Sequence, residues 1–489
     1  MRKHVVALAL LGAMGIMLLQ GCGGANSINS SLNSQTGSLV VFGTDAPSCD
    51  VFSFQVTITG ATLTPANGGA PVPIISSGDS ITVDFARLVG FASILKFSNV
   101  PVGTYSELTL TLSNPQLTVL DVTQTPPAPV PVASTTLTTS TVTVRLQPEL
   151  TVSSGGAAGL MIDFRLRKSV QTDANGQVTG LVDPIFRAGM TIVSSEEGVG
   201  VADELHGLVG SVTPTSSNPA FTGSFTLQTR GGVGPVFTVN VTSNTRFEGV
   251  TDLSGLMPST FVEVDAKVDT SGDIVAKEVE VEEQESEAGE KAAFLGSIIS
   301  INRDSSGNAA QFALLVFEEH PELTDSVPIR SPLTVNVLAT TMFGITRPGI
   351  NEAQLAFNAT TLGLGESVVV HGVVQPGSPA SVNANSIFLR PRTVLGNFTS
   401  LLAAAGDDKT GGFTLVPCGS IFKGQPITVL TFPDTSFIGV SGLIGLGPKP
   451  TIGVRGLLFY EQASGSANGA AWTAPTWVFE ARRVRQFPD

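Results

Sequence analysis

Hydrophobic residues recur along this chain mainly at every second position, in short runs. In residues 108–112, for example, leucine alternates with threonine, which is the pattern of a strand with one buried and one exposed face. Turn-forming residues separate the runs, as at Asn67-Gly68-Gly69 and Ser77-Gly78-Asp79. Helical spacing is nearly absent, and residues 85–97 form the one short candidate for a helix. The pattern therefore predicts an all-β protein.

The first group of predicted strands belongs to a single domain. These strands are rich in β-branched residues and cover residues 38–42, 51–59, 108–112, 117–119 and 142–146. A proline-rich stretch at 123–134 reads as an exposed loop. We expect an immunoglobulin-like or prealbumin-like β-sandwich over residues 38–194.

Four landmarks then occur three times in the same order. Each repeat opens on a glycine that is followed by serine four positions later, at Gly207, Gly296 and Gly396. A phenylalanine-centred strand, a Thr-Val strand and a Thr-x-Phe motif follow, the last at Thr245-Arg246-Phe247, Thr341-Met342-Phe343 and Thr435-Ser436-Phe437. Such recurrence indicates a duplicated domain. About five strands per repeat predict three small OB-like β-barrels, over residues 205–284, 294–393 and 394–489.

Glutamates crowd residues 278–290, between the first two repeats. Their first part still alternates like a strand, so it closes the first barrel. We interpret residues 285–293 as an acidic, solvated linker. A low-affinity Ca²⁺ site is the alternative, although the fixed ligand spacing of an EF-hand loop is missing.

The N-terminal stretch differs from everything that follows. Arg2 and Lys3 precede an apolar run over residues 5–19, which is shorter than the roughly 20 residues of a membrane-spanning helix. This order is typical of a removable secretory leader. Because small Gly21 precedes Cys22, we predict a lipoprotein signal peptide over residues 1–21, with palmitate-like acyl chains on Cys22. An ordinary signal peptide with an incidental cysteine is the alternative.

The expected location follows from this leader. Residues 22–37 are rich in serine and asparagine and form a flexible tether. Gly23, rather than aspartate, follows the lipidated cysteine, which favours the outer membrane of a diderm organism. The formal net charge of −14 argues against nucleic acid as a partner. Beyond the leader only Cys49 and Cys418 remain. An oxidising compartment permits a disulfide between them, but we expect two unpaired, buried thiols.

Candidate chemistry is sparse. Asp45, in Thr44-Asp45-Ala46-Pro47, and Asp163 and Asp84 are the carboxylates that draw attention. We expect them to cap turns or form buried hydrogen bonds, with metal binding at Asp45 as a weak alternative. His320, in a Glu-Glu-His-Pro-Glu segment, is a second weak metal candidate that we place in an exposed loop. Tyr105 fits a corner tyrosine whose hydroxyl bonds back to a loop.

Two tryptophans, Trp472 and Trp477, flank Pro475 near the C-terminus. Exposed at a barrel rim they would stack on sugar rings; we favour a role in the core of the third barrel. No nucleophile elbow, phosphate loop, dinucleotide fingerprint or paired histidine motif occurs. We therefore predict no cofactor and no catalytic residues.

Some of these segments resemble known families. Gly37-Ser38-Leu39-Val40-Val41, Thr44-Asp45-Ala46-Pro47, residues 100–105 and Ile162-Asp163-Phe164, together with Lys168-Ser169-Val170 and Asp183-Pro184-Ile185, resemble domain-of-unknown-function family 4382. The repeats resemble domain-of-unknown-function family 5666, and the first repeat does so best. Neither resemblance implies an activity.

Together these features predict a non-catalytic, lipid-anchored cell-envelope protein with a binding, adhesion or scaffold role. Its partners would be the membrane, through Cys22, and an envelope protein or glycan. Repeated modules on a tether would present several weak sites. One alternative is an envelope hydrolase whose carboxylates, such as Asp45 and Asp163, converge only in the folded chain. Another is an accessory subunit of an export or assembly system.

Overall fold

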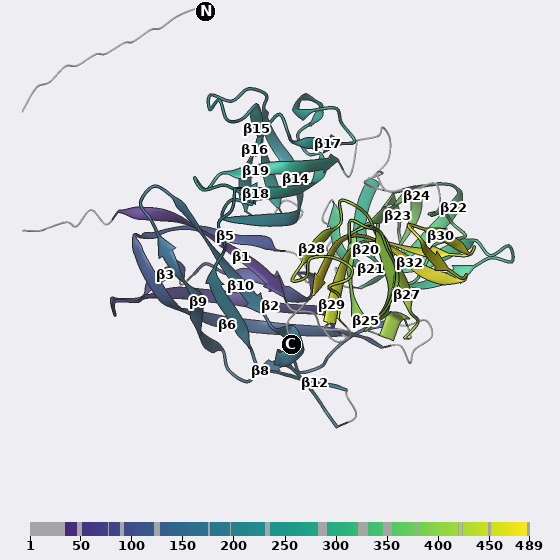
Figure 1. Ribbon diagram of the computed structural model, residues 1–489, viewed down its shortest axis with the longest axis horizontal. Helices are drawn as coiled ribbons and strands as arrows, with labels where there is room; N and C mark the ends of the chain where they lie inside the picture. The colour runs from purple at the N-terminus through teal and green to yellow at the C-terminus, as the bar shows by residue number, and fades with distance from the viewer. Residues whose placement is uncertain are drawn as a thin grey trace, which may run out of the picture. The chain divides into compact units, whose positions relative to one another are not determined.

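The computed structural model describes residues 35–45, 51–76, 78–88, 92–121, 128–174, 177–195, 197–229, 235–281, 291–320, 331–345, 355–377, 380–418, 420–422, 424–447 and 451–486. Strands dominate this part of the chain (Figure 1), as the alternating pattern predicts. Among the described residues, no helix is long and apolar enough to span a membrane. The leader, Cys22 and the acidic residues 282–290 lie outside the described part.

The helix expected over residues 85–97 is wrong. Only the 3-10 turn η1 (Phe85–Arg87) forms, and β5 (Ser93–Pro101) follows it. β5 pairs antiparallel with β1 (Thr36–Asp45). Backbone pairing with a distant strand therefore overrides the local crowding of apolar residues.

The N-terminal domain is a β-sandwich. Its main sheet runs β3-β2-β6-β9-β13-β10-β1-β5, with β4 beside β2 and β7 beside β6. The remaining bounds are β2 (Val51–Pro65), β3 (Val72–Ile75), β4 (Ile81–Asp84), β6 (Gly103–Asp121), β7 (Ala128–Pro131), β9 (Thr141–Val152), β10 (Ala157–Phe164) and β13 (Phe186–Met190). A small sheet adds β8 (Thr136–Leu137), β11 (Val170–Thr172) and β12 (Val178–Val182), beside the short helix α1 (Leu166–Ser169). Phe164 stacks on Phe54 and contacts Phe85 and Phe186 in the core.

The three repeats form three barrels of one topology. In each, the first strand pairs with the second and with the last but one of the barrel strands, and the third runs parallel to the last. The first barrel contains β14 (Gly200–Thr213), β15 (Gly223–Thr229), β16 (Val236–Val241), β17 (Arg246–Glu248), β18 (Phe261–Val268) and β19 (Ile274–Val281), with turn η3 (Leu253–Gly255). The second contains β20 (Lys291–Arg303), β21 (Ala309–His320), β22 (Pro332–Ile345), β23 (Ser367–Gln375) and β24 (Ser381–Arg390). The predicted OB-like topology is confirmed.

The third barrel contains β25 (Arg392–Ala404), β26 (Gly411–Pro417), β27 (Ile427–Thr431), β28 (Ser436–Ile438), β29 (Thr451–Glu461) and β32 (Thr476–Gln486). Turn η4 (Ser420–Phe422) follows β26, and the hairpin β30 (Gly465–Ala467)–β31 (Ala470–Trp472) is inserted before β32. Pro391 alone separates the second barrel from the third.

The repeated sequence landmarks have structural causes. Phe225, Phe312 and Phe413 are buried in the barrel cores. A Cβ atom at Gly207, Gly296 or Gly396 would lie 2.3–2.4 Å from a carbonyl oxygen of the next strand, so only glycine fits. The threonine of each Thr-x-Phe motif donates its hydroxyl to a carbonyl of the last strand; the acceptors are Ala276, Ala384 and Ala481.

The domains pack into one unit, Gln35–Asp489. Phe42 of the sandwich belongs to the same apolar cluster as Phe225 of the first barrel. Gly200 is required at this junction, because a Cβ atom there would lie 2.5 Å from the Phe42 ring. A second cluster joins Phe294 of the second barrel to Phe459 of the third. The domains are therefore joined by shared apolar clusters and are not independent units along the chain.

Candidate functional site

A charged row crosses the outer face of the first barrel. His206 on β14 lies opposite Glu263 on β18, and Glu263 lies opposite Glu280 on β19. Their neighbours Val262 and Val264 belong to the barrel core. Because strand side chains alternate between faces, the row points outward. It is nevertheless buried, since other domains cover it.

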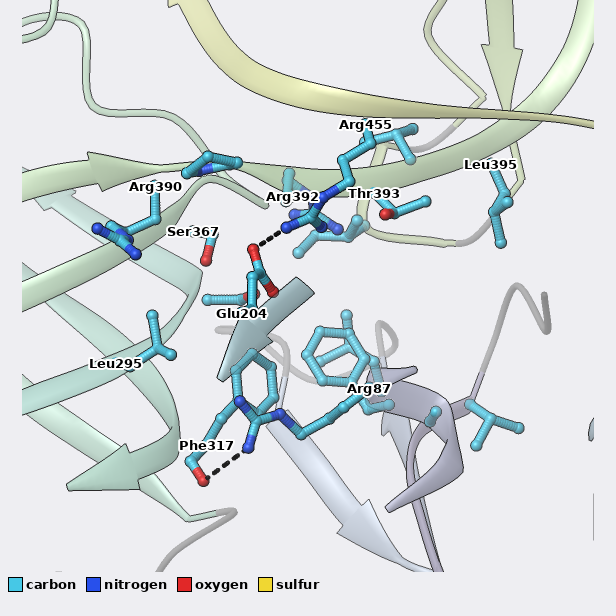
Figure 2. A pocket seen from close by; sticks show the side chains of 18 of the residues that line it. Arg87, Glu204, Leu295, Phe317, Ser367, Arg390, Arg392, Thr393, Leu395 and Arg455 are labelled. Carbon is cyan, nitrogen blue, oxygen red and sulfur yellow. Dashed lines mark hydrogen bonds and ion pairs between the residues drawn. The ribbon is translucent and has the colours of Figure 1, made fainter. Parts of the chain in front are cut away.

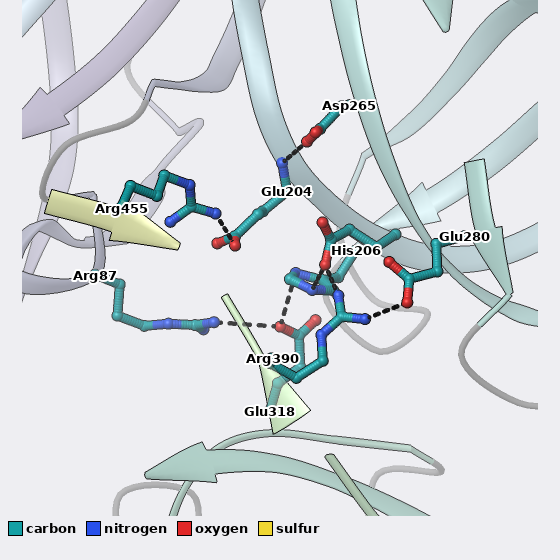
Figure 3. A network of polar contacts seen from close by, with 9 residues as sticks. Arg87, Glu204, His206, Asp265, Glu280, Glu318, Arg390 and Arg455 are labelled. Atoms are coloured by element: carbon teal, nitrogen blue, oxygen red, sulfur yellow. Dashed lines mark hydrogen bonds and ion pairs between the residues drawn. The ribbon is translucent and has the colours of Figure 1, made fainter. Parts of the chain in front are cut away.

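Arg390, the last residue of β24 in the second barrel, binds this row. Its guanidinium forms ion pairs with Glu263 and, at 2.8 Å, with Oε1 of Glu280. The three side chains are only 1–4% exposed. Burial lowers the pKa of Arg390 to about 9, so the side chain stays charged at neutral pH. Figure 3 shows this network.

His206 lies beside the same carboxylates. Its Nε2 is 3.3 Å from Oε2 of Glu263, and its Nδ1 is 3.6 Å from Oε2 of Glu318. Burial lowers its pKa to about 4; Glu318 raises the value and Arg390 lowers it further. The imidazole is therefore neutral at pH 7.

A β-bulge presents two further acids of the first barrel to the third. The register of β14 against β18 shifts between Ala202 and Leu205, which displays Asp203 and Glu204. Asp203 accepts a hydrogen bond of 3.0 Å from Arg483, and Glu204 pairs with Arg455. These two arginines are themselves cross-strand neighbours on β32 and β29. Burial raises the pKa of Asp203, but the charge and hydrogen bond of Arg483, together with Arg455 and Lys277, lower it, and the net shift is downward.

The sandwich joins the network through Arg87. Its Nη2 lies 3.5 Å from Oε2 of Glu318 on β21, and its guanidinium lies over the ring of Phe317 at 5.5 Å. Each acid of the network thus meets an arginine from another domain. Such buried pairs position segments of the fold, and losing one partner is costly.

A cavity of about 210 Å³ lies within this network. Residues of all four domains line it, among them Phe52, Arg87, Glu204, His206, Glu263, Leu295, Arg390, Arg392, Thr393, Cys418, Phe422 and Arg455. Figure 2 shows the lining side chains, with the Arg455–Glu204 and Arg87–Phe317 contacts drawn as dashed lines.

The carboxylates expected from the sequence lie elsewhere and apart. Asp45 ends β1 and accepts the backbone N–H of Leu166 at 3.1 Å, which holds the start of α1. Asp163 lies opposite Thr44 in the sheet, and Phe164 lies opposite Asp45. Asp45 and Asp163 therefore point to opposite faces and do not share a cleft. Burial raises the pKa of Asp163, and Arg485 is the strongest of three arginines that lower it.

Asp84 and Tyr105 serve the sandwich. Asp84 accepts hydrogen bonds from the hydroxyl of Ser53 at 2.6 Å and from the N–H of Phe54 at 2.9 Å. The hydroxyl of Tyr105 donates to the carbonyl oxygen of Pro101 at 2.7 Å, so the corner contact predicted for it is present.

The weak metal and ligand candidates do not gather into a site. The backbone of His320 ends β21 and pairs with Ala293, so the exposed loop expected there is wrong; its side chain lies outside the described residues. No group of three His, Cys, Asp or Glu side chains among the described residues is placed to hold a metal ion. Trp472 is 5% exposed and Trp477 packs between Phe422 and Tyr460. Their indole N–H groups donate to carbonyls of Ala463 and Leu364.

The expectation of unpaired thiols is wrong, because Cys418 is disulfide-bonded. The other two cysteines, Cys22 and Cys49, lie outside the described residues. Cys418 lines the cavity together with Val51, the first residue of β2, so distant segments meet at this point. Sequence spacing alone does not reveal such a meeting.

Sequence reasoning also missed the charged row. Its available signal was Glu263 and Glu280 at alternate positions within valine-rich strands. That pattern places both on one face, but it does not reveal that a second domain covers the face.

Two family models match parts of the chain. Residues 36–179 match the family DUF4382, a domain of unknown function. Residues 209–280 match DUF5666, a second domain of unknown function. Both named families are therefore confirmed in the predicted order, and the DUF5666 match covers the first repeat.

No curated protein matches the chain. Among solved structures, the chain is similar to "drosophila Unr CSD456" at 11% sequence identity. The likeness covers 59% of this chain and 98% of that chain, with a TM-score of 0.13.

Proposed function

We propose that this protein is a non-catalytic, lipid-anchored component of a cell envelope that acts as a binding platform or scaffold. One observation carries the proposal. The buried charges at the centre of the described chain are committed to ion pairs between domains: Arg390 with Glu263 and Glu280, and Arg455 with Glu204. Charges used in this way fix one domain against another, as a platform requires.

The hydrolase alternative draws less support. Asp45 and Asp163 lie on opposite faces of one sheet. Glu204 and Glu263 do line one cavity, but a guanidinium group binds each of them. A pair of carboxylates that works on a substrate needs at least one group able to exchange a proton with it.

The anchor rests on the leader and on Cys22. In a bacterial host, a fatty-acid analogue should label the wild-type chain and not a Cys22→Ser variant, and the variant should leave the membrane fraction while staying folded. A Gly23→Asp variant is the matched control: it should keep the label and, in a diderm host, move to the inner membrane. A Cys22→Ser variant that still fractionates with membranes would contradict the anchor.

The platform role is tested with the full-length protein. Crosslinking in intact envelopes and glycan arrays should recover a partner protein or a glycan. A panel of ester, peptide and glycoside substrates should show no turnover. Robust hydrolysis that survives purification, together with no partner, would replace the platform with the enzyme.

A further inference from the structure

The cavity in the charged network has an excess of positive charge among the residues that line it. Four arginines line it, at positions 87, 390, 392 and 455, against the carboxylates of Glu204 and Glu263. His206 also lines it and is neutral at pH 7, because burial lowers its pKa to about 4. The lining is therefore suited to a negatively charged guest.

Three of these arginines are already engaged. Arg390 binds two glutamates, Arg455 binds Glu204, and Arg87 reaches Glu318 and the carbonyl of Phe317. Arg392 differs: its Nε and Nη1 are buried and make no hydrogen bond within the described part of the chain. The guanidinium lies over the ring of Phe422, 5.7 Å from the ring centroid. This cation–π contact does not use the N–H groups of the guanidinium as hydrogen-bond donors.

Glu366 does not fill this gap. It interacts with Arg392 electrostatically, but its oxygens accept hydrogen bonds from the backbone N–H groups of Gly363 and Tyr460. Burial lowers the pKa of Arg392 to about 10, so the group remains a cation at neutral pH. The hydroxyl of Thr393, the next residue, is likewise buried and has no hydrogen-bond partner among the described residues.

A buried cation whose donors are unsatisfied costs several kcal/mol, and native folds satisfy such groups with a ligand, an ion or water. We propose that this cavity binds a small oxyanion, held by the guanidinium of Arg392 and the hydroxyl of Thr393. Ser297 and Ser367 also line the space. At about 210 Å³ the cavity is smaller than the roughly 300–1,000 Å³ of drug-sized sites, which restricts the guest to a small ion or one charged group.

Titration of the full-length protein with inorganic phosphate tests this proposal. Calorimetry and thermal unfolding in phosphate, sulfate, acetate and chloride at equal ionic strength should show saturable binding of at least one oxyanion and none of chloride. Arg392→Gln should weaken that binding roughly tenfold to a hundredfold, and Thr393→Val about threefold to tenfold. Arg246→Gln is the control, because it removes an arginine of the first barrel whose side chain is 54% exposed. It should leave oxyanion binding unchanged.

A parallel titration with glycerol phosphate identifies the source of the anion. Tighter binding of the ester than of free phosphate would assign the site to a phosphate group on a larger molecule. The proposal fails if no oxyanion binds better than chloride, or if the wild type and both variants bind equally. Should Arg392→Gln not fold, Thr393→Val and the chloride comparison decide.

Discussion

The first and second barrels have the same interior landmarks, but they differ in one row of side chains on the outer face. Counted from the opening glycine of each repeat, His206, Glu263 and Glu280 correspond to Leu295, Val369 and Phe388. Leu295 and Val369 belong to a small apolar cluster, whereas the charged row binds Arg390. Both His206 and Leu295 face the same cavity.

This difference distinguishes the residues that close a barrel from the residues that join it to a neighbouring domain. The glycine, phenylalanine and threonine landmarks recur because every barrel needs them to close. The outer row is free to vary, because it contacts whatever lies beside that barrel. In the third barrel the row reads Leu395, Gly453 and Arg485, and Arg485 interacts with Asp163 of the sandwich.

Removing Arg390 should cause the largest loss of stability. Arg390→Met leaves Glu263 and Glu280 buried without their cation, which should cost about 3–5 kcal/mol of unfolding free energy. Urea unfolding of the full-length protein measures this loss.

The control gives the first barrel the row of the second, with Arg390→Leu, His206→Leu, Glu263→Val and Glu280→Phe together. Replacing a complete buried ion set by apolar residues is often neutral or stabilising, so this variant should recover most of the loss. If it is as unstable as Arg390→Met, the two rows are not interchangeable.

The second-largest effect should be a loss of stability at acid pH that comes from His206 in the row of the first barrel. Burial lowers the pKa of His206 from near 6.5 to about 4, so the unfolded chain takes up this proton first as the pH falls. The stability from neutral His206 is complete above pH 6.5 and declines down to pH 4, by roughly 3 kcal/mol in all.

His206→Leu, which carries the residue of the second barrel, should lose this part of the pH dependence. Unfolding measured in urea at a series of pH values from 7 to 4 checks the difference between variant and wild type. Parallel curves for the two proteins would show that folding does not shift the pKa of His206.

The sequence reveals the parts of the fold that repeat and hides the parts that depend on contact between domains. Gly207, Gly296 and Gly396 could be found because the same steric demand recurs three times. Alternation along β18 is enough to put Glu263 on the outside of its barrel. That position reads as solvent-exposed until Arg390 covers it. The disulfide of Cys418 was only the less favoured alternative for the same reason, since no local pattern specifies its partner.

Shared features should respond alike in both barrels. A Cβ atom would lie 2.4 Å from the carbonyl oxygen of Gln228 at Gly207, and 2.3 Å from that of Leu315 at Gly296. Each glycine-to-alanine change should therefore cost about 1–3 kcal/mol through overpacking. Gly103→Ala is the control, because nothing lies within 4 Å of a Cβ atom there. If thermal unfolding shows that Gly103→Ala loses as much stability as the other two variants, the steric explanation is wrong.

The smallest effect should come from the threonines. Thr245 accepts the N–H of Thr242 at 3.0 Å and donates to Ala276, and Thr341 repeats this arrangement with Leu338 and Ala384. Changing Thr245 or Thr341 to valine leaves one backbone N–H and one carbonyl without this partner. Both side chains are partly exposed, so water replaces some of the lost bonding, and each change should cost about 1 kcal/mol. Serine at either position keeps the hydroxyl and should be nearly neutral. If the two valine variants lose unequal amounts of unfolding free energy, contacts between domains also affect the interiors of the barrels.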